Sequence, residues 1–310
     1  MVAMRRSHWL LILCLLAAAS VARAQVAPAA ESGFHGINGE TDPFPPVLGY
    51  NVTLNGTGQH SSVTGWSEYL EPALSYRFNE HVALNASVPY YISVKNFVPV
   101  TKSGATTYPL RSGSNLLGDA TVDAALDFEP GDFGESLTAT GAFPTGNSEF
   151  GLSANTPTYN VTNHLEYSIG IFTPDIEFGE GNSSSLAGRN VNKSYTAVGP
   201  EANFQAGSSL DLGLRITLDL EAYEEMPIGN QNVYGTVTRK NKKGKTVTKQ
   251  VLEGTGVAED NGFSADFSIP FLRGFTFSGD YQRSLIQGYD IASVTVSWVL
   301  RRPHRTRPWE

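Results

Sequence analysis

Hydrophobic and polar residues alternate one by one along many stretches of this chain. In the longest stretch, residues 210–223, seven apolar side chains alternate with seven others, of which four are charged. Successive side chains of a β-strand point to opposite faces, so the stretch predicts one apolar and one polar face over about 45 Å. Soluble strands usually have about five or six residues, whereas a tilted transmembrane strand needs roughly 9–11. The pattern therefore favours a strand that crosses a membrane.

The same alternation recurs along the chain and predicts an all-β protein of about twelve strands, within a range of roughly 10–14. The 31 glycines, 13 tyrosines and 16 phenylalanines also favour strands over helices. The alternation is strong at 120–128, 263–271, 275–282 and 292–298, and weaker at 47–55, 66–78, 81–93, 135–143, 159–169, 172–179 and 195–206.

Short and long connections alternate between these strands. The short ones lie near 79–80, 130–132, 170, 207–209 and 273–274. The longer ones lie near 95–117, 144–157, 180–193 and 225–261, with shorter members near 56–62 and 285–289. Short turns on one side and long loops on the other are typical of an outer-membrane barrel.

An open sheet edge cannot satisfy its backbone hydrogen bonds in lipid, so strands that enter a membrane must close into a barrel. We therefore predict a closed antiparallel transmembrane β-barrel with short periplasmic turns and longer external loops. The alternative is a soluble periplasmic β-sandwich, which also alternates when one face of a sheet is solvated. In a sandwich the apolar faces would form a core, and nothing would sort the loops by length.

Residues 1–24 have the features of a cleaved signal peptide. Two arginines precede the apolar residues 9–19, and Ala22-Arg23-Ala24 supplies the small residues that signal peptidase requires. The apolar run is too short to span a bilayer, which needs about 20 residues. We expect export to the bacterial outer membrane. Residues 25–46 then form a periplasmic segment or a plug, 47–300 the barrel, and 301–310 a basic C-terminal tail.

The chain is acidic, with 22 Lys and Arg against 30 Asp and Glu and a formal net charge of −8. Phosphates would repel such a chain, so no nucleic-acid partner is expected. The basic residues 239–249 are flanked by alternating segments and predict an external β-hairpin, whose lysines either contact lipopolysaccharide phosphates or lie in solvent. A single cysteine excludes a disulfide framework. The sequence contains no common catalytic or metal-ligand motif, so it predicts no enzyme, cofactor or metal.

If the apolar faces meet lipid, the polar faces line the lumen of the barrel. Burying many carboxylates without partners would cost several kcal/mol each, so we expect a hydrated lumen that favours cations. The alternative is that several of these acids lie near strand ends in bulk water. The predicted lumen-lining residues are Asp123, Asp127, Glu166, Glu201, Asp211, Arg215, Asp219, Asp266 and Asp280, and the same faces carry Glu71, Arg77, His164, Asp175, Glu177 and Glu221.

Residues 118–146 resemble the outer-membrane transporters grouped as the "MetA-pathway of phenol degradation" family. The resemblance rests on a Gly-Asp pair at Gly118-Asp119, a hairpin, and a strand that ends in Pro144-Thr145-Gly146 before an external loop. It implies a β-barrel associated with uptake of aromatic or other small organic compounds. The chain departs from the usual outer-membrane pattern, because the barrel-assembly machinery reads a terminal aromatic residue and this chain continues past Trp298 to residue 310.

These observations predict an outer-membrane, porin-like channel that passes small organic solutes by diffusion through an acidic lumen. Its expected partners are outer-membrane lipid and lipopolysaccharide, the barrel-assembly machinery and small-molecule solutes. The sequence indicates no oligomeric state. Two alternatives remain: a structural or adhesive barrel that acts through its external loops, and a soluble periplasmic β-sandwich binding protein.

Overall fold

The computed structural model describes residues 48–300, except 63–64, 98–99, 103–104, 108, 154–156, 183–194, 199, 214–215, 229–231, 241–245, 256–259, 273 and 287. The predicted signal peptide, the segment 25–46 and the tail 301–310 lie outside the described residues. No helix in the described part of the chain is long and apolar enough to cross a membrane.

The described residues fold almost entirely into antiparallel strands, with one short 3-10 helix. The elements are β1 (Gly49–Ser61), β2 (Gly65–Arg77), β3 (Val82–Ser87), β4 (Tyr90–Phe97), β5 (Val100–Lys102), β6 (Ala105–Thr107), β7 (Leu110–Gly113), β8 (Leu116–Leu117), β9 (Ala120–Phe128), β10 (Phe133–Phe143), η1 (Ser148–Phe150), β11 (Thr158–Tyr167), β12 (Phe172–Gly181), β13 (Tyr195–Val198), β14 (Glu201–Asp211), β15 (Thr217–Pro227), β16 (Asn232–Lys240), β17 (Thr246–Thr255), β18 (Asp260–Leu272), β19 (Phe275–Ser284) and β20 (Asp290–Val299).

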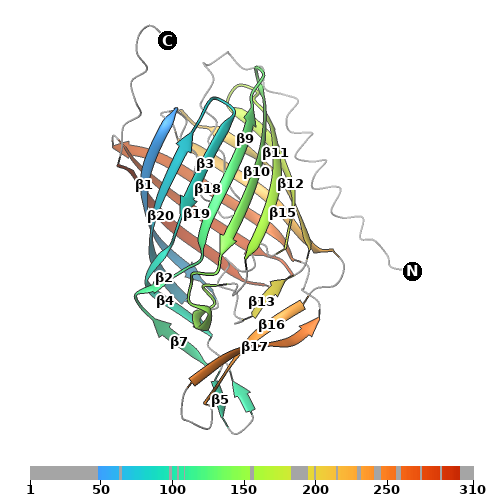
Figure 1. The fold of residues 1–310 in the computed structure, drawn as a ribbon. Coiled ribbons are helices and arrows are strands. Elements are labelled where there is room, and N and C mark those ends of the chain that lie inside the picture. Colours follow the sequence, from blue (N-terminus) through green and yellow to red (C-terminus); the bar gives the residue numbers. More distant parts are fainter. Residues whose placement is uncertain are drawn as a thin grey trace, which may run out of the picture.

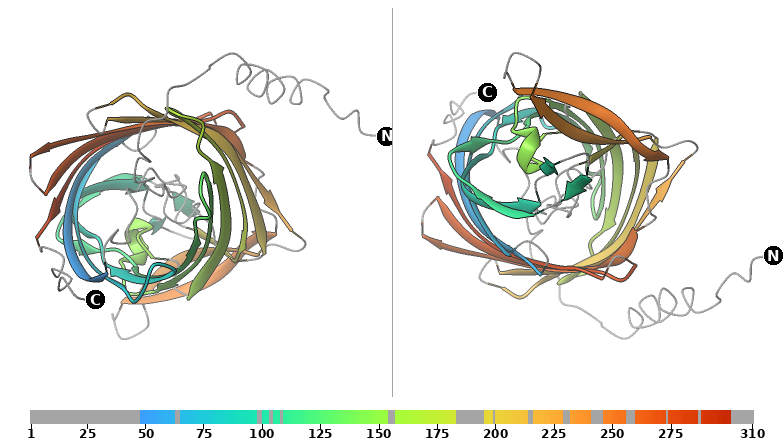
Figure 2. Two further views of the ribbon diagram at one scale, coloured as in Figure 1. Left: turned by 90° about the horizontal axis from the view of Figure 1, so that it is seen from above. Right: turned by 90° about the horizontal axis from the view of Figure 1, so that it is seen from below.

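The main sheet closes on itself as a barrel (Figures 1 and 2). Twelve of its 15 strands form the barrel. The other three are short: β4 pairs with β2 beyond the end of β3, and β7 and β8 pair with β4. The order is β1-β20-β19-β18-β15-β14-β12-β11-β10-β9-β3-β2, and β2 pairs again with β1. The predicted closed antiparallel barrel of about twelve strands is confirmed.

The barrel carries its apolar side chains on the outside. Nearly every barrel strand exposes large hydrophobic side chains, such as Leu74 (55% exposed), Leu126 (54%) and Val294 (46%). The buried side chains are mostly polar, and the buried hydrophobic residues of the described chain are few. A soluble sandwich buries its apolar faces, so this distribution rules out the sandwich alternative. An apolar surface this extensive is typical of a lipid-facing barrel.

Exposed aromatic side chains lie near both ends of the barrel strands. Phe275 stacks on Trp298 with ring centroids 5.4 Å apart, and Tyr76 contacts Phe78 edge-on at 4.7 Å. At the opposite ends of their strands lie the exposed rings of Trp66, Phe143 and Tyr159, among others. Two aromatic bands of this kind are typical of membrane–water interfaces.

The two ends of the barrel differ in the length of their connections. The connections β2–β3, β9–β10, β11–β12, β14–β15 and β18–β19 are short and lie at one end, here called the short-turn end, together with the start of β1 and the end of β20. The other end, the long-loop end, carries β4 to β8, η1 and the separate sheet β13-β16-β17 (Figure 1). The predicted hairpin around 239–249 is present as β16 and β17, in which Lys240 lies opposite Thr246.

The longest alternating stretch, 210–223, is not a single strand as predicted. β14 ends at Asp211 and β15 begins at Thr217, and the Leu212 N–H donates to the Ile216 carbonyl across the turn between them (2.9 Å). The predicted turn at 207–209 is therefore wrong. The alternation of apolar and polar residues continues through the turn at 212–216, so the alternation alone does not reveal that the chain reverses there. Gly213, with φ of 81°, does mark the turn.

Three strand boundaries also differ from the predictions. β1 runs to Ser61, so the loop predicted at 56–62 is much shorter. The predicted strand 81–93 breaks at Val88-Pro89 into β3 and β4, because proline has no N–H for the ladder. The predicted strand 195–206 consists of β13, which belongs to the separate sheet, and the first part of β14.

Candidate channel lumen

Three carboxylates lie directly opposite one another on neighbouring strands of the inner wall. The strand register pairs Asp219 of β15 with Asp266 of β18, and Asp266 with Asp280 of β19. Adjacent strands are about 5 Å apart, so the three groups form a row at that spacing. Asp219 and Asp266 are 3% and 8% exposed, and Asp280 accepts a hydrogen bond from the Ser293 hydroxyl of β20. We call Asp219, Asp266 and Asp280 the aspartate row.

A second group of acids surrounds His164 on β11 and β12, which β14 separates from β15. The His164 Nε2 atom lies 3.7 Å from Glu166 Oε2, and its Nδ1 atom lies 3.8 Å from Glu177 Oε2. Asp175 is paired with Glu166 across β12 and β11. His164 and Glu177 are 7% and 2% exposed. The His164 imidazole is therefore buried with a carboxylate near each of its two nitrogen atoms.

Glycines on the inner wall make room for these long acids. Glu221 lies opposite Gly207, where an added Cβ would come within 2.7 Å of the Glu221 Cγ atom. Glu166 lies opposite Gly134 in the same way, again at 2.7 Å from its Cγ atom. The acidic side chains therefore lie flat over the neighbouring backbone and remain along the wall of the barrel.

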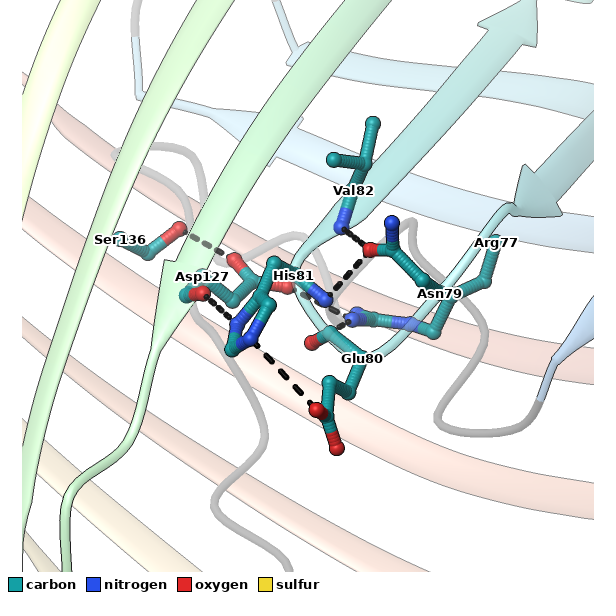
Figure 3. A network of polar contacts seen from close by, with 7 residues as sticks. All are labelled: Arg77, Asn79, Glu80, His81, Val82, Asp127 and Ser136. Atoms are coloured by element: carbon teal, nitrogen blue, oxygen red, sulfur yellow. Dashed lines mark hydrogen bonds and ion pairs between the residues drawn. The ribbon is translucent and has the colours of Figure 1, made fainter.

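Asp127 belongs to a separate network near the short-turn end (Figure 3). Its Oδ2 atom accepts a hydrogen bond from Arg77 Nη1 (2.8 Å), and its Oδ1 atom accepts one from the Ser136 hydroxyl (2.7 Å). In the turn before β3, Asn79 Oδ1 accepts the backbone N–H groups of His81 and Val82, both at 2.8 Å. The charge of Asp127 is thus paired with an arginine, and the network ties the β2–β3 turn to β9 and β10.

The other predicted lumen residues lie apart from these clusters. Asp123 Oδ2 accepts a hydrogen bond from Asn85 Nδ2 (3.0 Å), and Glu201, 3% exposed, begins β14 at the long-loop end. Asp211 ends β14, where its Oδ1 atom accepts the Gly213 N–H (2.8 Å), so it stabilises the turn at the barrel's end. Arg215 lies outside the described residues. The structure thus brings Glu166, Asp175 and Glu177 together around His164, and Glu221 of β15 lies between this group and the aspartate row.

Sequence reasoning missed a buried carboxylate at the long-loop end. Asp260, fully buried, accepts hydrogen bonds from the hydroxyls of Ser284 (2.6 Å) and Tyr289 (3.2 Å), with Tyr223 at 3.5 Å. The residue falls in the loop predicted at 225–261. Extending the alternation of 263–271 backwards by three residues would have placed it on the polar face with Asp266.

No group of three or more His, Cys, Asp and Glu residues in the described chain has an arrangement that could hold a metal ion. The acids of the inner wall are distributed along and across strands instead of converging on one point. What this arrangement can provide chemically is a negative potential along one side of a closed barrel.

Neither a protein-family model nor a curated protein sequence matches the chain. Solved structures do. The COG4313 outer membrane channel from Pseudomonas putida F1 superposes with a TM-score of 0.53 at 14% identity, over 89% of this chain and 100% of that one. This likeness shows the fold, a barrel of the outer-membrane type. The resemblance to the phenol-degradation family remains a resemblance of short motifs.

Two further structures overlap less well. The KdgM porin in complex with disordered oligogalacturonate has a TM-score of 0.48 at 7% identity, covering 81% of this chain and 100% of that one. The Pseudomonas putida toluene transporter TodX has a TM-score of 0.43 at 9% identity, covering 82% and 89%.

Proposed function

We propose that the protein is a passive channel of the bacterial outer membrane and that small organic solutes diffuse through it. We also propose that a cleaved signal peptide directs its export. The observation that carries the proposal is the combination of an apolar outer surface with acids on the inner wall of a closed barrel. The apolar belt would contact outer-membrane lipid. The motif resemblance supports aromatic compounds among the solutes.

The inner acids give the proposed channel a preference for cations over anions. A monovalent cation about 5 Å from one carboxylate gains about 1–3 kcal/mol, depending on how much water screens the pair, and an anion loses as much. Only β14 separates the acids around His164, on β11 and β12, from the aspartate row, which begins on β15, so their potentials add along the wall. Among the other acids, Asp127 contributes little because Arg77 neutralises it.

The test is ion selectivity of the purified, refolded protein in planar bilayers. We expect the reversal potential across a KCl gradient to indicate cation preference, and the variant with Asp219→Asn, Asp266→Asn and Asp280→Asn to lose most of it. The matched control is Glu80→Gln, which removes a carboxylate whose side chain is 87% exposed on a turn. The measurement is made near 0.1 M salt, where the field of an exposed charge persists over about 10 Å before salt screens it.

Equal selectivity in the triple variant and the wild type would overturn the role of the aspartate row. Absence of conductance from protein that still migrates as a heat-modifiable barrel would overturn the channel. It would favour a structural or adhesive barrel that acts through its loops.

A further inference from the structure

The two short motifs, Gly118-Asp119 and Pro144-Thr145-Gly146, meet at the long-loop end of the barrel. The Thr145 hydroxyl oxygen accepts the Ala120 N–H (2.9 Å), and the same hydroxyl donates to the Gly118 carbonyl (3.1 Å). The Gly146 N–H donates to Asp119 Oδ1 (2.9 Å). Each of these hydrogen bonds joins a side chain of one motif to the backbone at the other. We call Gly118, Asp119, Thr145 and Gly146 the clasp.

Gly146 is the residue of the clasp that no other amino acid can replace without movement. A Cβ atom there would lie 2.1 Å from the Leu152 carbonyl oxygen, 2.7 Å from the Gly118 carbonyl carbon and 2.8 Å from the Asp119 nitrogen. All three are backbone atoms, so no side-chain rotation can relieve the overlap. The requirement for glycine here comes from close approach of two chain segments.

Beyond the clasp, the chain folds back into the barrel mouth. Asn147 donates its N–H to the Leu117 carbonyl (2.9 Å), and its side-chain oxygen accepts the Phe150 N–H (3.2 Å) at the start of η1. Both end-on views show η1 within the outline of the barrel (Figure 2), and Figure 1 shows it at the long-loop end, beside β4 and β7. Leu152, 7% exposed, donates its N–H to the Asn147 carbonyl (3.0 Å), which closes the turn.

The inner end of this segment is fixed against β4 and β7. Asn96 of β4, 1% exposed, donates from Nδ2 to the Phe150 carbonyl (2.5 Å). The Phe150 ring covers Gly113 of β7, where a Cβ would lie 2.7 Å from the ring. Residues 147–153, which we call the mouth segment, are therefore held at their start by the clasp and at their midpoint by Asn96.

We propose that the clasp holds the mouth segment across the mouth of the barrel and that the mouth segment thereby sets the largest solute the channel admits. The inference rests on the proposed channel function. A segment inside the mouth narrows the path available to solutes, and its position depends on a few short contacts to the β8–β9 junction. Loss of those contacts frees the outer half of the segment to move toward solvent and widens the path.

The experiment compares solute size limits in proteoliposomes. The variants are Gly146→Ala, which forces backbone apart, and Thr145→Val, which removes both hydroxyl hydrogen bonds at nearly constant volume. The matched control is Gly141→Ala in β10, where the nearest atom to the added Cβ is the Val122 carbonyl oxygen at an ordinary 3.9 Å. Swelling rates are measured with arabinose, glucose, sucrose and raffinose, and heat-modifiable migration verifies that each barrel is folded.

We expect both clasp variants to raise the rate for sucrose and raffinose several-fold relative to arabinose, while Gly141→Ala behaves as the wild type does. Unchanged size dependence in folded Thr145→Val and Gly146→Ala would overturn the inference. If Gly146→Ala does not fold, Asp119→Ala combined with Thr145→Val takes its place.

The outcomes also separate this inference from the channel function. A wild type that passes no solute, with clasp variants that do, would overturn free diffusion and support the clasp. Absence of transport in the wild type and in every folded variant would overturn both.

Discussion

Replacing Arg77 by methionine should lower the free energy of unfolding by about 3–5 kcal/mol, because it leaves the Asp127 carboxylate buried without its charge partner. The Arg77 and Asp127 side chains are only 11% and 14% exposed, and their closest atoms are 2.8 Å apart. Methionine keeps most of the apolar part of the Arg77 side chain, so the loss of stability reports mainly the removal of the positive charge. The Ser136 hydroxyl still donates to Asp127, which places the expected loss toward the lower end of that range.

The assay is a double-mutant cycle with Asp127→Asn, followed by urea unfolding of the protein in lipid vesicles. We expect the double variant to be less destabilised than the sum of the single ones, with a coupling energy of roughly 1–3 kcal/mol. The matched control is Arg283→Met. Its ion pair with Asp290 has side chains that are 37% and 33% exposed, so its loss should cost much less than that of the Arg77 pair. Additive losses, or equal losses in Arg77→Met and Arg283→Met, would refute the reasoning.

Two further predictions concern the outer surface and the buried carboxylate. Leu137→Arg places a charge on the outward face near the middle of β10, where the leucine is 41% exposed. It should destabilise the lipid-embedded barrel by about 2–4 kcal/mol. The control variant Glu149→Arg, in η1 outside the barrel wall, should not be destabilised. Unfolding in vesicles measures both, and a neutral Leu137→Arg would argue against a lipid-facing wall. Ser284→Ala removes a fully buried 2.6 Å hydrogen bond to Asp260 and should cost about 1–3 kcal/mol in the same assay. A change below about 0.5 kcal/mol would show that the remaining partners of Asp260, Tyr289 and Tyr223 among them, satisfy the carboxylate.

The sequence was sufficient to predict the fold, because alternation reports directly which side chains share a face of a strand. It failed where a chain reversal preserves the alternation, as between Asp211 and Thr217. The aspartate row could not be predicted, because period two indicates the face of Asp219, Asp266 and Asp280 but not their register across three strands.

The clasp lay within reach of the sequence. The turn at 130–132 fixes a hairpin in which Ala120 pairs with Phe143, and one step further along the hairpin places Asp119 beside Pro144. The inward course of the mouth segment could not be obtained in this way. It depends on Asn96 and Gly113, which come from strands before the hairpin and meet Phe150 only in the closed barrel.

The pairing of β1 with β20 also means that the barrel cannot close until the last strand is present. Thr57 and Thr295, 238 residues apart, share a hydroxyl hydrogen bond of 2.9 Å across this seam. Until β20 has been made, β1 and β19 both carry rows of unpaired backbone groups, which lipid cannot satisfy. A chain that stops before Asp290 therefore has no stable membrane-embedded form, and insertion must wait for the last strand. We therefore expect truncated chains to be sensitive to added protease and complete chains to become resistant when the seam closes.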